Sequence, residues 1–428
     1  LPPFARPLDR RYSISCINPK VLARDTSFTK DVLEKSIEAR SERSRNTGWS
    51  KSIANDTLKP SVQHLNTYNE VWGFVQGSKE YAVIGSTWGT HILDVSDPAN
   101  TTEVVSIQGE YSDTFVVHRD YHDYQGYLYM VCDEGGGTSK LRIVDLSYLP
   151  DSAPTVYLSG ALFSKSHNIF IDTAKAKLYT CGGNSNPGVR VFSLVNPIFP
   201  VEISTVSLNA TSHDIYVRND TAYINDGEDG LLIYNFSNAA SPQLIGSLTS
   251  YPHQGYNHSG WLNANGSVYV LADETHGMDL KILDVSDLSN ITVLDTINSQ
   301  SVEPFIIPHN VMIKGAHAYV SYYFDGLVIF DISDPQNPFI SGYYDTSTEL
   351  PVNNVYRGCW GVYCMLPSGT VLASDMQNGL YVLDVSNATS IPEESDKNTS
   401  HTVIYPNPFN ESFVISSSST ENKEQKYI

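Results

Sequence analysis

Short runs of hydrophobic residues, each followed by a polar turn, recur along most of the chain. In the clearest repeat, Asp325-Gly326 precedes the nearly continuous apolar run 327–332, and Ser333-Asp334-Pro335 follows it. An Asp-Gly pair favours a two-residue hairpin, and an unbroken apolar run of this length indicates a strand that is covered on both faces. The whole repeat predicts antiparallel strands at residues 308–313, 318–323, 327–332 and 339–343.

The phrase Leu93-Asp94-Val95-Ser96-Asp97-Pro98 returns, with erosion, at a nearly constant distance. Its second position falls at residues 94, 145, 193, 235, 284, 331 and 384, which gives steps of 51, 48, 42, 49, 47 and 53. A period of about 40–50 residues built from short strands is typical of propeller blades. The sequence therefore predicts an all-β fold, a seven-bladed β-propeller over residues 64–400, with extended arms at 1–63 and 401–428.

The two arms lack the repeat. Residues 25–45 mix charges of both signs and predict one short, exposed helix. In the C-terminal arm, residues 403–416 read as strand, proline turn and strand, and a polar tail follows at 417–428. Two strands are too few to fold alone, so we expect them to pair with another sheet.

The net charge and the hydropathy of the chain limit the classes of partner that it could bind. The 428 residues include 47 acidic and 27 basic side chains, a net charge of −20, which argues against nucleic acid or anionic lipid as a partner. No run of 18 apolar residues occurs, so we expect no membrane span. The sequence begins at Leu1 rather than Met, which is consistent with a leader that has been removed.

Asn-x-Ser/Thr motifs indicate the secretory compartment more strongly than cysteines do. The five cysteines are too few and too unpatterned for a disulfide scaffold. Motifs for N-linked glycans begin at Asn55, Asn100, Asn209, Asn219, Asn235, Asn257, Asn265, Asn290, Asn387, Asn398 and Asn410. The alternative is that an Asn- and Ser-rich chain contains them by chance. We predict a secreted glycoprotein, placed outside the cell or at its surface.

Two tracts resemble known families. Residues 71–95, together with His118-Arg119-Asp120 and 166–169, resemble the LVIVD-repeat, choice-of-anchor B group of secreted propellers over about residues 64–390. That resemblance implies a propeller and extracellular placement, and it implies no defined biochemical role. Separately, residues 405–410 (YPNPFN) resemble the start of the C-terminal sorting tail used for type IX secretion in Bacteroidota, although the rest of such a tail is missing.

The candidate functional residues share one position in the repeat. Aligning the predicted innermost strands places one histidine per blade at a single register, at His118, His167, His213, His258 and His309. Trp72 and Trp360 occupy that register in the first and last repeats. In four blades a small polar residue follows the histidine, namely Asn168, Asp214, Ser259 or Asn310. Equivalent positions on innermost strands surround the axis of a closed propeller, so we expect these side chains to face one channel.

These axial histidines have two interpretations. Propellers often use one histidine per blade as a structural hydrogen-bond hub. Alternatively, several imidazoles facing one axis could hold a transition metal, for which neutral histidine is the commonest ligand. In the second case we expect at least three of the five as ligands at about 2.0–2.2 Å, and loss of the metal on replacing His213 by Ala. Four other histidines lie outside this register: His122, His253, His276 and His317.

Three functions stay open from sequence. The first is a structural or interaction module that self-assembles head-to-tail into an extracellular fibre through its terminal arms. The second is a metal-binding protein or metalloenzyme that uses the axial histidines. The third is a carbohydrate- or peptide-binding propeller, suggested by 27 tyrosines and five tryptophans. No Ser-His-Asp or Cys-His arrangement stands out in the sequence, and nothing in it demonstrates an enzyme.

Overall fold

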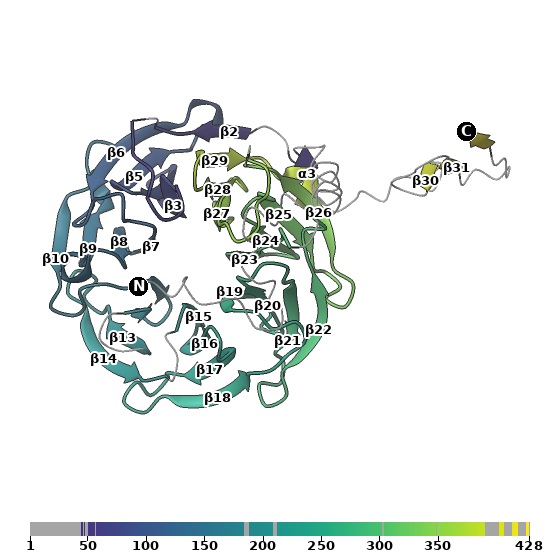
Figure 1. Ribbon diagram of the computed structural model, residues 1–428. Coiled ribbons are helices and arrows are strands. Elements are labelled where there is room, and N and C mark those ends of the chain that lie inside the picture. The colour runs from purple at the N-terminus through teal and green to yellow at the C-terminus, as the bar shows by residue number, and fades with distance from the viewer. Residues whose placement is uncertain are drawn as a thin grey trace, which may run out of the picture. The chain divides into compact units, whose positions relative to one another are not determined.

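Seven antiparallel sheets surround a common axis, and each forms one blade of a β-propeller (Figure 1). The computed structural model describes residues 44–45, 47, 50–55, 57–183, 188–208, 212–301, 304–347 and 349–389, with the backbone of three further strands between residues 402 and 427. The predicted all-β, seven-bladed architecture is confirmed. The chain divides into two compact units, Leu1–Ala388 and Thr389–Ile428.

Each of the first five blades is a run of four consecutive strands. The first blade contains β3 (Tyr68–Gln76), β4 (Lys79–Ser86), β5 (Gly89–Asp94) and β6 (Thr102–Gln108). The second contains β7 (Arg119–Tyr124), β8 (Tyr127–Cys132), β9 (Leu141–Asp145) and β10 (Thr155–Ser159). The third contains β11 (Asn168–Asp172), β12 (Lys177–Cys181), β13 (Val189–Ser193) and β14 (Val201–Val206).

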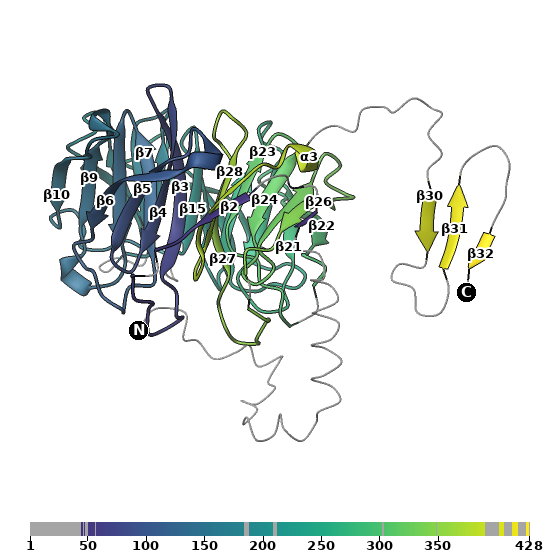
Figure 2. The same cartoon turned by 90° about the horizontal axis from the view of Figure 1, so that it is seen from above.

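The fourth and fifth blades follow the same plan. The fourth contains β15 (Asp214–Arg218), β16 (Thr221–Asn225), β17 (Leu231–Asn235) and β18 (Gln243–Leu248). The fifth contains β19 (Asn257–Leu262), β20 (Val268–Asp273), β21 (Leu280–Asp284) and β22 (Thr292–Ile297). The first strand of each blade lies nearest the axis and the last lies at the rim (Figure 1). Figure 2 shows the blades edge-on, with their strands running between the two faces of the propeller.

Strands from the N-terminal arm complete the last two blades. The sixth blade contains β23 (Val311–Lys314), β24 (His317–Ser321), β25 (Leu327–Asp331) and β26 (Phe339–Tyr344), and β1 (Ser44–Arg45) pairs with β26. The seventh contains β27 (Cys359–Tyr363), β28 (Val371–Asp375) and β29 (Gly379–Leu383). Its outermost strand is β2 (Ser50–Ile53), antiparallel to β29, so a segment from the start of the chain joins the last blade.

This closure differs from the boundary predicted at residue 64, and the difference has a physical cause. Rim strands are less buried than the strands inside a blade; every residue of β18, for example, is exposed or half-buried, whereas β25 is buried along almost its whole length. The repeat phrase belongs to the buried third strand, so a closing rim strand carries no part of it. Pairing β2 with β29 satisfies the backbone groups that an open edge would expose.

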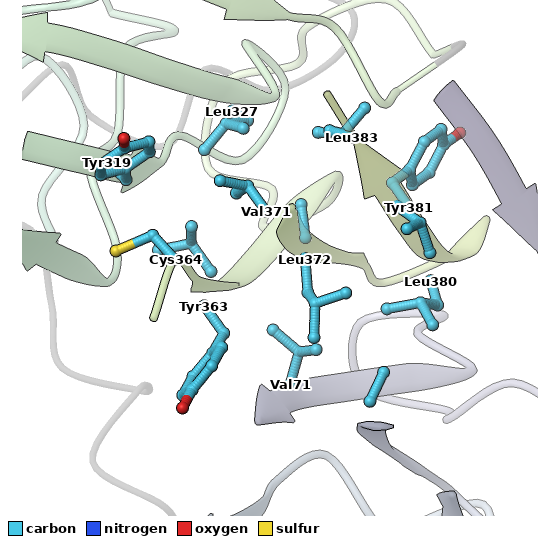
Figure 3. Close-up of a cluster of buried hydrophobic side chains, with 14 of the residues drawn as sticks. Val71, Tyr319, Leu327, Tyr363, Cys364, Val371, Leu372, Leu380, Tyr381 and Leu383 are labelled. Carbon is cyan, nitrogen blue, oxygen red and sulfur yellow. The ribbon is translucent and has the colours of Figure 1, made fainter. Parts of the chain in front are cut away.

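Hydrophobic side chains hold the closing blades together. Figure 3 shows Val71 of β3 close to Leu372 of β28, with Leu327, Val371 and Leu383 packed nearby. These side chains are at most 2% exposed, so the first, sixth and seventh blades share one dry core. The four described cysteines, Cys132, Cys181, Cys359 and Cys364, are free and buried.

The C-terminal unit contains a small antiparallel sheet of β30 (Thr402–Tyr405), β31 (Phe413–Ser417) and β32 (Gln425–Tyr427), in that order. The predicted strand, turn and strand at 403–416 are present as β30 and β31, and the polar tail adds a third strand that its composition did not predict. The helix predicted at 25–45 lies outside the described residues, except for Ser44 and Arg45, which form β1. No helix in the described part of the chain is long and apolar enough to cross a membrane.

Candidate metal centre on the propeller axis

Five histidines and one tryptophan form a closed ring of aromatic side chains, called the histidine ring below. Its members are His118, His167, His213, His258, His309 and Trp360. Successive ring centroids are 4.0, 4.3, 4.0, 4.2 and 4.4 Å apart in that order, and Trp360 lies 5.9 Å from His118. Each side chain is between 2 and 4% exposed. The structure thus brings all five predicted histidines together.

The start of each innermost strand positions these side chains. His118, His167 and His213 immediately precede β7, β11 and β15. His258 and Trp360 are the second residues of β19 and β27, and each lies at a bulge in the pairing with the next strand. A β-bulge turns a side chain away from the regular alternation of a strand, which lets these two residues join the ring.

Trp72 does not belong to the histidine ring. It lies further along β3, half-buried, with its ring centroid 4.4 Å from His122 and 4.9 Å from Tyr363. Trp72 shares its register with Tyr363, which follows Trp360 by three residues. Because a tryptophan occurs in both strands, an alignment of the sequence alone makes Trp72 and Trp360 look equivalent.

A polar layer lies next to the ring, one position further along the chain in four blades and two positions after His118 in the second blade. It consists of Glu70, Asp120, Asn168, Asp214, Ser259 and Asn310, and so includes the four small polar residues that follow histidines in the sequence. The Asn310 amide donates to Glu70 Oε2 at 2.7 Å, and the Ile169 N–H donates to Asp120 Oδ2 at 2.6 Å. Burial raises the pKa of Glu70 and of Asp120 well above the usual carboxyl range.

Two groups of three side chains within reach of the ring have metal-ligand chemistry. The first triad is His118, Asp133 and His167, and the second is His213, His258 and Glu274; within each, the ligand atoms lie within 4.8 Å of one another. Two imidazoles and one carboxylate form a donor set that zinc and iron(II) sites use. Two donors at 2.0–2.2 Å from one ion are at most about 4.4 Å apart, so small side-chain movements would suffice.

The environment of four ring histidines favours the neutral imidazole. Burial, together with neighbouring imidazoles, lowers the pKa of His118, His213 and His258 well below the usual histidine value, and burial lowers that of His309 to about 3. Neutral imidazole is the form that binds metals, and an imidazole that is already neutral releases no proton on binding.

The two carboxylates differ in their surroundings. Asp133 Oδ2 lies 2.7 Å from His167 Nδ1; burial acts to raise the pKa of Asp133, but the charge and hydrogen bond of His167 hold it below the usual range. Glu274 Oε2 lies 3.7 Å from His258 Nε2, and burial raises the pKa of Glu274 to about 8. The Tyr323 hydroxyl donates to the other oxygen of Glu274.

The structural-hub interpretation explains one nitrogen of one histidine. His309 Nδ1 lies 2.5 Å from the Trp360 carbonyl oxygen and so ties the sixth blade to the seventh. In the described part of the chain, however, Nδ1 of His118 and Nδ1 of His258 have no hydrogen-bond partner. Buried polar atoms are normally hydrogen-bonded, so these nitrogens are the feature that a hub does not explain.

An apolar cluster packs against the histidine ring and excludes water from it. Val117, Ile307, Tyr323 and Met376 are at most 3% exposed and contact Trp360, and Tyr356 packs on the cluster. The ring therefore lies between this cluster and the polar layer.

The remaining predicted residues lie elsewhere. His122 is buried in β7, and His253 is exposed. The ring centroid of His276 lies 5.2 Å from that of Tyr356, and His317 lies next to the Asp331 carboxylate. Exposed glycan motifs are Asn55, Asn100, Asn219, Asn265, Asn290 and Asn387. Asn235 is half-buried, and Asn209, Asn398 and Asn410 lie outside the described residues. Asn257 is fully buried and hydrogen-bonded to Asn225, so it is a poor acceptor site in the folded chain.

A comparison with known protein families confirms that the chain contains a sequence repeat. The family model for the LVIVD repeat matches residues 75–108, 211–250, 308–346 and 373–399. The chain contains LVIVD repeats. These repeat matches fall in the first, fourth, sixth and seventh blades and their flanks. No curated protein matches the sequence.

Solved structures of other propellers are similar in fold. A protein from Lactobacillus plantarum has a TM-score of 0.54 and 13% identity, over 72% of this chain and 88% of that one. The structure of U3-55K has a TM-score of 0.54 and 10% identity, over 78% and 98%. The WD40 repeats of RRP9 have a TM-score of 0.53 and 11% identity, over 76% and 99%. At these identities the likeness shows the fold alone.

Proposed function

We propose that this LVIVD-repeat propeller binds transition-metal ions on its axis, one in each triad. The observation that carries the proposal is the closed, buried ring of five imidazoles with a carboxyl side chain beside each of two histidine pairs. Imidazoles that face one another in a buried ring stabilise the fold little by that contact. A bound ion would instead coordinate the Nδ1 atoms of His118 and His258, which have no hydrogen-bond partner among the described residues.

Each ion would join two neighbouring blades. In the first triad, His118 and Asp133 come from the second blade and His167 comes from the start of the third. In the second triad, His213 precedes the first strand of the fourth blade, whereas His258 and Glu274 belong to the fifth. Because the apolar cluster and the polar layer enclose the ring, we assign the ions a structural role in fastening the blades.

Metal titration tests the proposal. Protein stripped with a chelator and then titrated with Zn²⁺ or Co²⁺ should bind two ions per chain, as measured by elemental mass spectrometry after desalting. An ion that binds only the folded state, at a free concentration of a thousand times its Kd, stabilises that state by about 4 kcal/mol. The melting temperature should therefore rise on loading and fall again with EDTA.

A matched control separates the axial site from adventitious surface binding. His253 is exposed, with 73% of its side chain accessible, and lies off the ring, so His253→Ala should bind the same two ions. Retention of less than one ion per chain for every metal tried, or a melting temperature that does not respond to metal, would contradict the proposal.

A second proposal concerns assembly and rests on the C-terminal unit. Among the described strands of that unit, β31 is paired on both sides, whereas β30 and β32 each have one neighbour. An open strand edge can accept a strand from another chain. We propose that the arm links copies head-to-tail as an extracellular fibre, as repeated heterologous contacts do. Because β1 and β2 pair within their own propeller, the contact is assigned to the C-terminal arm.

Deletion of residues 401–428 tests assembly. The truncated protein should be monomeric at concentrations where the full chain forms larger species in light scattering. An unchanged particle size would contradict the assembly proposal and leave the metal proposal unaffected. The second proposal also includes secretion, membership of the choice-of-anchor B group, a sorting role for the C-terminal tail, and N-glycans on the exposed motifs.

A further inference from the structure

Beyond the polar layer, a second set of side chains lines the axis, and it has a different character. Two positions further along each innermost strand stand Trp72, His122, Phe170, Tyr216, Trp261, Met312 and Tyr363, called the aromatic cage below. Side chains two apart on a strand share a face, so the cage lies on the axis like the polar layer, but further from the histidine ring. Every blade contributes one member.

The cage members touch one another and surround a hollow. Tyr363 packs on Trp72 at 4.9 Å, Trp72 on His122 at 4.4 Å, and His122 on Phe170 at 5.3 Å between centroids. The circle continues from Phe170 to Tyr216 at 5.3 Å and from Tyr216 to Trp261 at 4.6 Å. All seven residues line one cavity of about 260 Å³. Sites for drug-sized ligands span about 300–1,000 Å³, so this cavity suits a small ligand.

The polar groups of the cage are largely engaged within the protein. The Trp72 indole N–H donates to Asp123 Oδ1 at 2.9 Å, and His122 Nδ1 lies 2.9 Å from the Asp123 carbonyl oxygen. The Tyr216 hydroxyl is hydrogen-bonded to Arg218. These three groups are therefore already engaged and are not free to hydrogen-bond a sugar. What the cage offers instead is the faces and edges of six aromatic rings.

Aromatic faces attract cations. The negative face of an aromatic ring binds ammonium groups, and aromatic cages are the usual sites for quaternary ammonium ligands. A carboxylate that accepts the indole N–H, as Asp123 does for Trp72, makes that indole more electron-rich. Arg218, a cation at the cavity, is held by the carbonyl oxygens of Asn263 and Ala264 at 2.8 and 3.1 Å. The net charge of −20 favours the approach of cations to the whole molecule.

We propose that the aromatic cage is a binding site for a small quaternary ammonium compound of the choline type. The trimethylammonium group would occupy the cavity among Trp72, Tyr216 and Trp261, with no hydrogen bond required of it. The site is separate from the histidine ring and does not depend on bound metal. Unlike a carbohydrate site, it should bind choline more tightly than a sugar such as glucose.

Choline titration into the full-length protein, followed by calorimetry and tryptophan fluorescence, tests the site. We expect a Kd of about 1 mM or lower, since a small ligand that buries its whole head group can reach such an affinity. The uncharged isostere of choline, in which carbon replaces the quaternary nitrogen, should bind at least about tenfold more weakly, because it keeps the shape and loses the cation–π attraction.

Variants locate the binding. Trp72→Leu and Trp261→Leu should each weaken choline binding about tenfold. Trp88→Leu should leave it unchanged, because Trp88 packs beside His91 and is not a cage member. Equal affinity for choline and its isostere, tighter binding of glucose than of choline, no choline binding in the millimolar range, or wild-type affinity in both cage variants would each overturn the proposal. The comparison of choline with its isostere uses the wild-type protein, so it holds even if a variant fails to fold.

Discussion

Replacing His213 with alanine is expected to reduce the metal content of the protein from two ions to one while the fold remains intact. His213 belongs to the second triad, with His258 and Glu274, and the first triad keeps all its ligands. Loss of a direct ligand should weaken that site by more than about 100-fold, since even changes to residues behind the ligands cost 10–100-fold. Elemental analysis of the desalted, loaded variant measures the change.

The two triads can be separated by a matched pair of isosteric substitutions. Asp133→Asn should remove the ion of the first triad only, and Glu274→Gln that of the second, because each replaces a carboxylate ligand by an amide of the same shape. The combined variant should hold no axial ion. If His213→Ala keeps both ions, or if it destabilises metal-free protein as much as metal-loaded protein, the histidines are a structural hub instead.

Lys281→Met is expected to destabilise the metal-free propeller by about 3–5 kcal/mol, because it would leave a buried carboxylate without its counter-charge. Lys281 and Asp273 form an ion pair at 2.7 Å in which both side chains are fully buried. Lys281 Nζ also donates to the carbonyl oxygens of His253 and Asp279, at 2.6 and 2.9 Å. The pair therefore fixes the segment before β19 against the third strand of the fifth blade.

Urea unfolding in the presence of EDTA measures this effect without a contribution from metal. Lys79→Met is the control, since Lys79 and Asp94 also form an ion pair but the lysine is half-exposed. Exposed pairs contribute about 0–1 kcal/mol. Equal losses of unfolding free energy for the two variants would show that burial of the Lys281 pair has no special consequence.

The blade pattern was predictable because it depends on local sequence. The buried third strands, such as β25, need an unbroken apolar run, and the following turn needs residues like Ser333 and Asp334, so the phrase recurs wherever a blade does. The rim strand β2 was not predictable in this way. It pairs with residues more than 300 positions away, so nothing near it in sequence records its partner.

The candidate site was predictable in part for the same reason. One histidine per repeat can be read along the chain. The carboxylates that complete the triads follow the ends of second strands, each in an Asp-Glu pair, but the ligand is the first residue of one pair (Asp133) and the second of the other (Glu274). Trp72 was misplaced because both strands contain a tryptophan, although Trp72 shares its register with Tyr363, three residues after Trp360. The aromatic cage was missed because its members differ in type from blade to blade; the signal that could have found it is their constant spacing of two residues from the polar layer.

Anomalous X-ray diffraction from crystals of zinc-loaded protein, recorded on both sides of the zinc absorption edge, tests the central claim most directly. Two anomalous peaks should lie on the axis, one about 2.0–2.2 Å from ligand atoms of His118, Asp133 and His167 and the other at that distance from ligand atoms of His213, His258 and Glu274. An axis without anomalous density, with zinc found only at surface residues, would contradict the proposal that this propeller is built around bound metal.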